Sequence, residues 1–208
     1  MNETTSSAGN TLTIGIMRHF QTDWNALHKL QGRTDRPLTD DARKRLQELS
    51  LPAPWDEARL IATPLSRAQD TAQIVADREP EIEPDLIELS WGAWEGQRGV
   101  DLLADPSSGY EHVENWGWGK SPPRGESPAV AWERIAPVLR RLAITGKPSL
   151  LVVHRGIMRV IMAKAWGWDF DCPEPFKIKR ERIYPITLDA NGVPIDHGEA
   201  VRLPERST

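Results

Sequence analysis

The sequence predicts an α/β fold in which a mostly parallel central sheet lies between two layers of helices, a three-layer α/β/α sandwich. Short β-branched runs alternate with helical patterns along the chain, as in parallel sheets with helical crossovers. The run SLLVVH at 149–154 has no polar break, which places it centrally in the sheet. The 208 residues are 39% hydrophobic and 27% charged, a composition typical of one globular domain.

The other strands follow from short apolar runs. TLTIGIMRH at 11–19 is a buried strand, and RLIAT at 59–63 is a second one. EIEPDLIELS at 81–90 is expected as an edge strand, because Pro84 removes a hydrogen-bond donor. RIYPITLDANG at 182–192 closes the sheet and ends in an Asn-Gly turn.

Two helices are expected in the first half of the chain. The first begins at Thr39 or Asp40, either of which can cap it, and it ends before Pro52. The second begins with Thr63 as its cap and Pro64 as its first residue. The polar stretch before them, at 20–37, has no periodicity.

Two more helices are expected in the second half. Ser127 and Pro128 begin a helix that runs to Thr145, and Gly146 ends it. Pro137 within it predicts a kink or a late start. The stretch 156–168 is apolar on more than one face and is interpreted as a buried helix.

Composition narrows the function classes. A net charge of −4 gives no basic surface for nucleic acid or anionic membranes, so neither is expected as a partner. No apolar run approaches the ~20 residues of a membrane span. The polar residues 1–10 lack a secretory pattern and are expected to form a disordered tail before a domain at 11–208, with a cytoplasmic location. The oligomeric state is open, with a homodimer one option.

Metal binding is not expected. The one cysteine, Cys172, excludes an intrachain disulfide and disfavours a thiolate zinc site. Residues 91–126 form a long stretch rich in Gly, Pro, Trp and Ser, and such stretches are usually functional. Trp116 and Trp118 within it are candidates for an aromatic wall around a ligand, with core packing as the alternative.

Charged and polar side chains follow three predicted strands. The first strand ends in Arg18-His19, the second leads to Arg67, and the central one ends in His154-Arg155. The carboxyl ends of parallel strands meet at one edge of a sheet, where ligands bind in such folds. Arginine matches phosphate oxygens with two donors, and a neutral imidazole is a competent nucleophile. Each of these residues alone has a structural explanation, so the prediction of phosphoryl chemistry rests on the set.

At this point the sequence resembles the histidine phosphatase superfamily, also called phosphoglycerate mutase-like. RHFQTDWN at 18–25 is similar to the N-terminal Arg-His motif of that family, and VVHRGIMRVIM at 152–162 is similar to its C-terminal His-Gly segment. Four further stretches match in the family's order: QGRTDRPLT at 31–39, ATPLSRAQDTA at 62–72, LIELSWGAWEG at 86–96 and PRGES at 123–127. The resemblance covers 14–168 and implies a phosphoglycerate mutase-like fold.

The resemblance implies a role for each matching residue. His19 would be the nucleophile that becomes phosphohistidine, and Glu88 would be the proton donor, with Glu95 as the competing carboxylate. Arg18, Arg67 and His154 would bind the phosphoryl oxygens, and Asn25 and Gln31 would add polar contacts. No metal or other cofactor is implied, because the arginines supply the positive charge.

The sequence departs from the family pattern beside the site. Phe20 replaces the usual Gly after the nucleophile, and Gln21 replaces a Glu. Val153 stands where Ser or Thr is common, and Arg155 stands where Gly is common. Phe20, Gln21 and Arg155 are therefore expected to influence substrate binding, although a solvent-facing Arg155 is an equal alternative.

The leading hypothesis is a metal-independent phosphomonoesterase for a small phosphorylated metabolite, whose identity depends on a variable specificity segment at about 97–125. A cofactor-dependent phosphoglycerate mutase is one alternative, although the segment holds few basic residues. A non-catalytic relative that binds a phospho-ligand is the other, with Phe20 and Gln21 as signs of lost activity.

Overall fold

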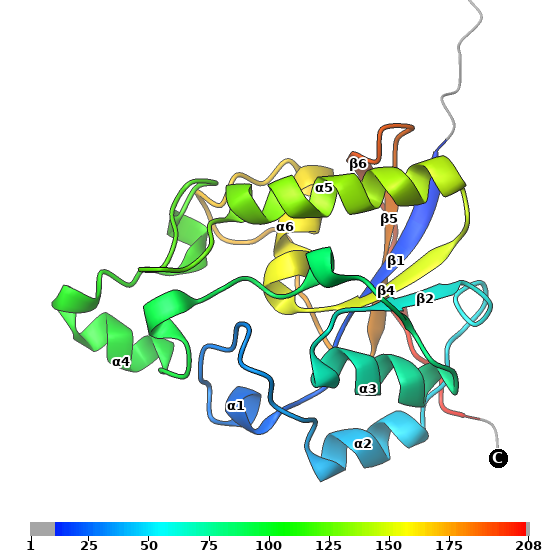
Figure 1. Ribbon diagram of the computed structural model, residues 1–208, viewed down its shortest axis with the longest axis horizontal. Helices are drawn as coiled ribbons and strands as arrows, with labels where there is room; N and C mark the ends of the chain where they lie inside the picture. Colours follow the sequence, from blue (N-terminus) through cyan, green and yellow to red (C-terminus); the bar gives the residue numbers. More distant parts are fainter. Residues whose placement is uncertain (1–10, 207–208) are drawn as a thin grey trace, which may run out of the picture.

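A seven-stranded sheet runs through the protein in the computed structural model, which describes residues 11–206 (Figure 1). The tail expected at 1–10 lies outside the described residues. The strand order is β3-β2-β4-β1-β5-β6, and β7 also pairs with β5. The strands are β1 (Leu12–Arg18), β2 (Arg59–Ala62), β3 (Glu81–Ile82), β4 (Ser149–Val153), β5 (Arg182–Leu188), β6 (Pro194–His197) and β7 (Val201–Arg202).

The pairing directions confirm a mainly parallel sheet. β3, β2, β4 and β1 pair in parallel, whereas β5 joins β1 in antiparallel orientation and extends the sheet to β6 and β7. The central position predicted for 149–154 is confirmed, since β4 is buried throughout and lies between β2 and β1. Arg18 at the end of β1 stands opposite Val153 at the end of β4.

Two pairs of helices cover the two faces of the sheet (Figure 1). Residues alternate along β4: Leu151 and Val153 join the core beneath α5 (Pro128–Thr145) and α6 (Arg155–Trp166). Leu150 and Val152 face the other way and join the core beneath α2 (Asp40–Gln47) and α3 (Ser66–Ala76). The period-two pattern of the strand thus builds both cores of the three-layer fold.

The ends of the helices follow from local capping chemistry. The Ser127 side chain accepts a hydrogen bond from the Val130 amide, and Gly146 ends α5 in a left-handed conformation with φ of 62°. Both ends agree with the sequence prediction, and the helix continues through Pro137 without a late start. Thr39, rather than Asp40, caps α2 by accepting from the Ala42 amide.

Two predicted boundaries are wrong. Helix α3 begins at Ser66 with Leu65 as its cap, although the Thr63 hydroxyl accepts a hydrogen bond from the Leu65 amide at 3.3 Å and also lies 2.8 Å from His154 Nε2. The strand predicted at 81–90 stops at Ile82, and Pro84 begins a 3-10 turn, η1 (Pro84–Leu86). Proline has the right φ for a first helical residue, which favours a turn over a continued strand.

The stretch 91–126 projects beyond the sheet at the left of Figure 1 and contains short helical pieces. These are η2 (Gly92–Trp94), α4 (Gly99–Ala104), η3 (Pro106–Ser108) and η4 (Val113–Asn115). A further short helix, α1 (Asp23–Ala26), lies in the polar stretch 20–37. We refer to residues 97–125 as the excursion.

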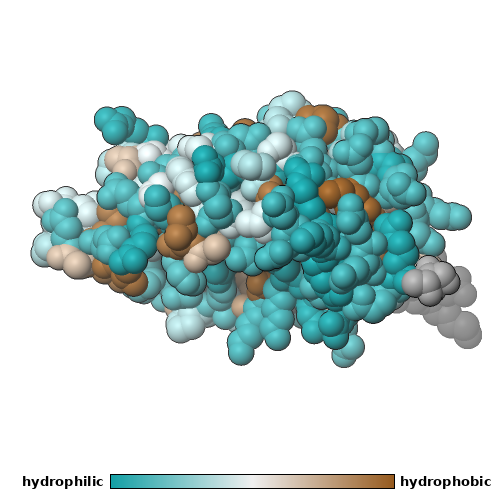
Figure 2. All heavy atoms as spheres, turned by 90° about the horizontal axis from the view of Figure 1, so that it is seen from below, coloured by the Kyte–Doolittle hydropathy of each residue, from teal (hydrophilic) through white to brown (hydrophobic). Residues whose placement is uncertain are grey.

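The molecular surface is mainly hydrophilic on the face seen in Figure 2, with hydrophobic side chains scattered over it, some of them at the end where α4 lies. On α4, Val100 and Leu103 are exposed. Across residues 11–206, no helix combines the length and the apolar character that a membrane crossing requires.

Candidate active site

A cavity of about 360 Å³ opens at the carboxyl ends of β1 and β4. Six of the predicted site residues line it: Arg18, His19, Asn25, Gln31, Glu88 and Arg155. His154 and Arg67 are fully buried and do not line it, although the His154 ring is only 5.1 Å, centroid to centroid, from that of His19. The strand ends therefore converge as the parallel topology predicts.

His19 is held in one orientation directly after β1. Its amide donates to the Val153 carbonyl at 2.9 Å, which fixes the backbone against β4. Its Nδ1 lies 2.6 Å from the Phe20 carbonyl oxygen. A carbonyl oxygen can only accept, so Nδ1 carries the hydrogen and Nε2 keeps a free lone pair. Burial, followed by the charges of neighbouring His154 and Arg67, lowers the pKa of His19 and keeps the ring neutral.

His154 follows β4 and precedes α6 as its cap residue. Its Nε2 lies 2.8 Å from the Thr63 hydroxyl, whereas its Nδ1 is buried without a partner. Burial, followed by the charges of Arg67 and Arg18, lowers the pKa of His154. The site therefore contains two neutral imidazoles side by side.

Glu88 lies against the N-terminus of α6. Its carboxylate accepts from the Gly156 amide at 3.1 Å, the Ile157 amide at 3.2 Å and the Leu89 amide at 2.8 Å. A Cβ on Gly156 would lie 2.5 Å from Glu88 Oε1, so glycine is what permits this approach. Burial raises the pKa of Glu88, although the amide hydrogen bonds and Arg67 oppose the shift. A carboxyl group of this kind can hold a proton at higher pH than usual.

The competing carboxylate, Glu95, has a structural contact instead. Its Oε1 accepts a hydrogen bond from the Thr34 amide, and its side chain does not line the cavity. Arg67 supports the same loop, since Nη1 donates to the Thr34 carbonyl at 3.0 Å and Nη2 to the Gly32 carbonyl at 2.6 Å. Of the two glutamates, only Glu88 reaches the cavity with His19.

Unpartnered donors gather around this cavity. Within residues 11–206, the buried polar side-chain atoms without a hydrogen-bond partner are Arg18 Nε, Gln31 Nε2, Arg67 Nε, His154 Nδ1, Arg155 Nε and Arg180 Nε. All belong to side chains that carry or can carry a hydrogen to donate. Burial, followed by the charges of Arg180 and Arg155, lowers the pKa of Arg18 to about 9. A bound anion would supply the missing acceptors and relieve the repulsion between these arginines.

Two predicted substrate contacts are placed elsewhere. The Phe20 ring is 3% exposed and packs in the core beneath α2 and α3, while its amide donates to the Thr71 hydroxyl at 3.0 Å. Gln21 is exposed and lines a separate hollow beside α2. Neither side chain lines the cavity, because the chain turns away from the site immediately after His19.

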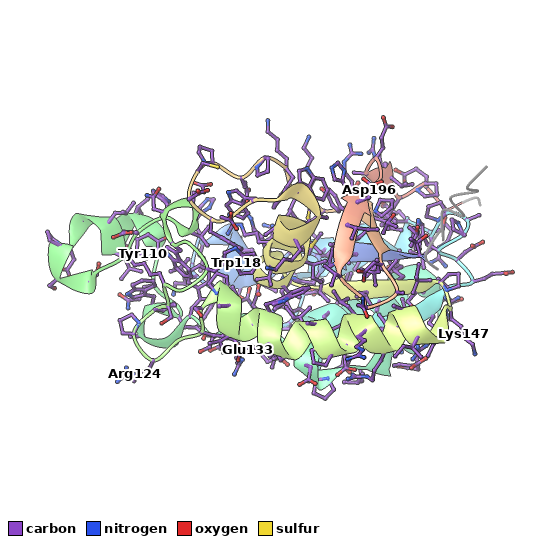
Figure 3. The ribbon with its side chains drawn as sticks, turned by 90° about the horizontal axis from the view of Figure 1, so that it is seen from above. Tyr110, Trp118, Arg124, Glu133, Lys147 and Asp196 are labelled. Atoms are coloured by element: carbon purple, nitrogen blue, oxygen red, sulfur yellow. The ribbon has the colours of Figure 1, made fainter. Side chains whose placement is uncertain are left out.

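The aromatic wall also differs from the expectation. Trp116 is buried, and its Nε1 donates to the Glu111 carbonyl at 3.1 Å. The Trp118 ring faces α6 instead, where the Lys164 Nζ lies 3.9 Å from the ring centroid. Trp91 and Tyr110 line the cavity instead. Figure 3 shows Tyr110 on the excursion, away from the helical layers. Trp116 therefore packs in the core, which was the alternative to a place in the aromatic wall.

Sequence reasoning missed several cavity residues. Arg180 lies beside the site, where its Nη2 donates to Asn25 Oδ1 at 2.7 Å. Arg159 lies one helical turn after Arg155, a spacing that could have identified it as a neighbour on the same face of α6. The stretch 20–37 contributes Lys29 and Leu30, and the excursion contributes His112, Val113 and Glu114. In the described part of the chain, no three His, Cys, Asp or Glu side chains gather as metal ligands would.

The chain is similar to known proteins in sequence and in fold. Residues 14–198 match the model of the histidine phosphatase superfamily (branch 1). Glucosyl-3-phosphoglycerate phosphatase of Mycolicibacterium vanbaalenii is 27% identical over 170 residues, 75% of each chain. A probable phosphoglycerate mutase GpmB of Enterobacter sp. (strain 638) is 35% identical over 106 residues, but this match spans only 49% of each chain. The crystal structure of phosphoglycerate mutase from Thermus thermophilus superposes with a TM-score of 0.67 at 28% identity, over 94% of this chain and all of that one.

Proposed function

The chain belongs to the histidine phosphatase superfamily, and on that premise we propose that it is a phosphomonoesterase that forms a phosphohistidine at His19. The proposal is carried by one observation: buried unpartnered donors surround a neutral histidine that shares a cavity with a carboxyl group of raised pKa. Two titratable groups whose surroundings shift their pKa values in opposite directions are typical of acid/base pairs in active sites. The substrate is a small phosphorylated metabolite.

In the first step, His19 Nε2 attacks phosphorus, a nitrogen–phosphorus bond forms and the bond to the leaving oxygen breaks. Glu88 donates its proton to that oxygen, so the product leaves as a neutral alcohol. The guanidinium of Arg18 and the ring of His154 stabilise the charge on the transferring group. The Nδ1 hydrogen bond of His19 to the Phe20 carbonyl supports the positive charge that the ring acquires.

In the second step, the Glu88 carboxylate takes a proton from water while the water oxygen attacks phosphorus. The nitrogen–phosphorus bond breaks, phosphate leaves, and His19 is neutral again with Glu88 protonated. Arg18 lines the cavity, and Arg67 with His154 lies directly behind it. The two arginines provide positive charge of the kind that a metal ion supplies in other phosphatases, so we propose a metal-independent reaction.

The test is hydrolysis of an aryl phosphate in excess chelator, with acid-quenched trapping of a labelled phosphoenzyme. His19→Ala is expected to abolish both turnover and trapping. His28→Asn is the matched control, because His28 is exposed and has a φ of 55° that asparagine tolerates. A labelled intermediate in His19→Ala would refute the nucleophile, and loss of wild-type activity on chelation would refute the metal-independent reaction.

A mutase is the second candidate, because two of the similar proteins carry that name. Such an enzyme moves a phosphate between two positions of a substrate and needs a bisphosphorylated primer. Phosphoglycerate isomerisation that depends on added bisphosphoglycerate, at a rate above that of phosphate release, would favour this function over the phosphatase.

A further inference from the structure

Two arginines on one face of α6 share a single carboxylate beside the cavity. Arg155 is the first residue of the helix, and Arg159 follows one turn later. Glu174 Oε1 accepts from Arg155 Nη2 at 2.7 Å, and Oε2 accepts from Arg159 Nε at 2.7 Å. Both arginines line the active-site cavity. One negative charge thus faces two positive charges, and the bridge leaves one positive charge uncompensated.

The inner half of this pair is buried. The side chains of Arg159 and Glu174 are 12% and 13% exposed, whereas Arg155 is 42% exposed and only its Nε is buried without an acceptor. Burial, followed by the charge of Arg155, lowers the pKa of Arg159. Within residues 11–206, Glu174 is the one side-chain acceptor that either arginine reaches. Uncompensated cations in such a setting favour an anion from outside the chain.

The whole cavity wall has the same imbalance. Four cationic side chains line it, Arg18, Lys29, Arg155 and Arg159, against the carboxyl groups of Glu88 and Glu114. Glu88 is the group that the proposed function protonates, which leaves Glu114 on the wall and Glu174 behind Arg155 and Arg159 as the opposing charges, two against four. One phosphate near His19 would engage Arg18, whereas Arg159 lies one helical turn beyond Arg155 along α6 and would keep the surplus charge of the pair.

We propose that the substrate carries a second anionic group, bound by Arg155 and Arg159, at the end remote from the phosphate that His19 accepts. This inference rests on the proposed function. The two positions belong to one cavity, because Arg155 directly follows His154, whose ring is 5.1 Å from that of His19. A volume of about 360 Å³ suits a short ester, and Trp91 and Tyr110 offer an apolar wall for its carbon chain. The second anion is a carboxylate or a phosphate.

The experiment compares alkyl phosphates of increasing chain length with the same esters carrying a terminal carboxylate or a terminal phosphate. The quantity measured is the ratio of kcat/KM for the doubly anionic ester to that for the plain ester. Wild type is expected to give a ratio of about ten or more, equivalent to ~1.4 kcal/mol. The series with the higher ratio, terminal carboxylate or terminal phosphate, identifies the second anion. A ratio near one in both series at every chain length overturns the proposal.

Opposite changes in two variants separate an anion site from a structural bridge. Arg159→Gln removes a cation and should lower the ratio toward one, with partial recovery in Arg159→Lys. Glu174→Gln removes the competing carboxylate and should raise the ratio. If the bridge only holds the loop onto α6, both variants will lower activity on all esters and leave the ratio unchanged. Arg202→Gln is the control, because Arg202 is 66% exposed and remote from the cavity lining.

A binding measurement keeps this inference separate from the proposed function. If wild type hydrolyses none of these esters, the phosphatase proposal fails. Calorimetry with unreactive alkyl phosphonates, with and without a terminal phosphonate, then decides the second site. A preference for the bisphosphonate that Arg159→Gln removes supports it, whereas equal binding of both compounds overturns it.

Discussion

A single methyl group at Gly156 should displace the carboxyl group of Glu88, the proton donor in the proposed function. The Cβ of alanine would lie 2.5 Å from Glu88 Oε1 and 2.8 Å from Leu89 Cδ1, whereas separations under 3.0 Å are essentially never seen. Glu88 must therefore move by at least 0.5 Å, away from the Gly156 and Ile157 amides that hold it. Helix propensity alone would favour alanine by ~1 kcal/mol, so the direction of the effect is informative.

The magnitude follows from the contacts that are lost. Overpacking costs roughly 1–3 kcal/mol, and hydrogen bonds to a charged group contribute about 1.5–3 kcal/mol. We expect Gly156→Ala to lower the free energy of unfolding by about 1–3 kcal/mol. A misplacement of this size should reduce kcat by about 10²-fold. Denaturant unfolding and steady-state hydrolysis of an aryl phosphate measure the two effects.

Gly119→Ala is the matched control, because its Cβ would meet nothing within 4 Å and its φ is not in the left-handed region. It should retain wild-type stability within about 0.5 kcal/mol, as surface substitutions usually do. Wild-type kinetics in Gly156→Ala would show that the close approach of Glu88 to α6 has no role in the reaction. Equal losses in both alanine variants would attribute the effect to glycine replacement in general.

Three further predictions concern titration and support. With an aryl phosphate, kcat/KM should rise with increasing pH as His19 loses its proton, and this rise should lie below pH 6.5 because the pKa of His19 is lowered. It should fall with increasing pH as Glu88 ionises, and this fall should lie above pH 4.5 because the pKa of Glu88 is raised. Glu88→Gln, which cannot ionise, should abolish the fall. Arg67→Lys should lower the free energy of unfolding in urea by about 2 kcal/mol, because one ammonium cannot replace both Nη contacts; wild-type stability would contradict this. The pKa of His154 is lowered on folding, so its stabilising contribution is present above pH 6.5 and lost below it. As the pH falls below 6.5, the free energy of unfolding of His154→Gln should decrease less than that of wild type, by up to ~1.4 kcal/mol per pH unit. Parallel curves of unfolding free energy against pH for the two proteins would refute the lowered pKa of His154.

The sequence predicted those parts of the site that lie at the ends of strands. Arg18 and His19 end one apolar run and His154 ends another, and parallel pairing then requires them to meet. The ends of α5 were also predictable, since Ser127 and Gly146 act through local backbone chemistry. Information within a few residues was sufficient in each of these cases.

Features that depend on distant partners were not predictable in the same way. Thr63 has the chemistry of a helix cap and accepts from the Leu65 amide, but the contact of its hydroxyl with His154 depends on a residue far along the chain. Phe20 is next to the nucleophile in sequence, yet its ring packs in the core on the opposite side of the chain. Glu174 and Arg180 lie in a loop without periodicity, and only the folded arrangement brings them to Arg155 and Asn25, which line the cavity.

The hydrogen bond from the His19 amide to the Val153 carbonyl has a consequence for how this protein acquires activity. It makes the spacing of the two histidines a property of the pairing between β1 and β4. Those strands are far apart along the described chain, so a very long loop must close before the site exists. Helices such as α5 can form locally without that step. During refolding, catalytic activity should therefore report the long-range strand pairing, which the recovery of helical content does not.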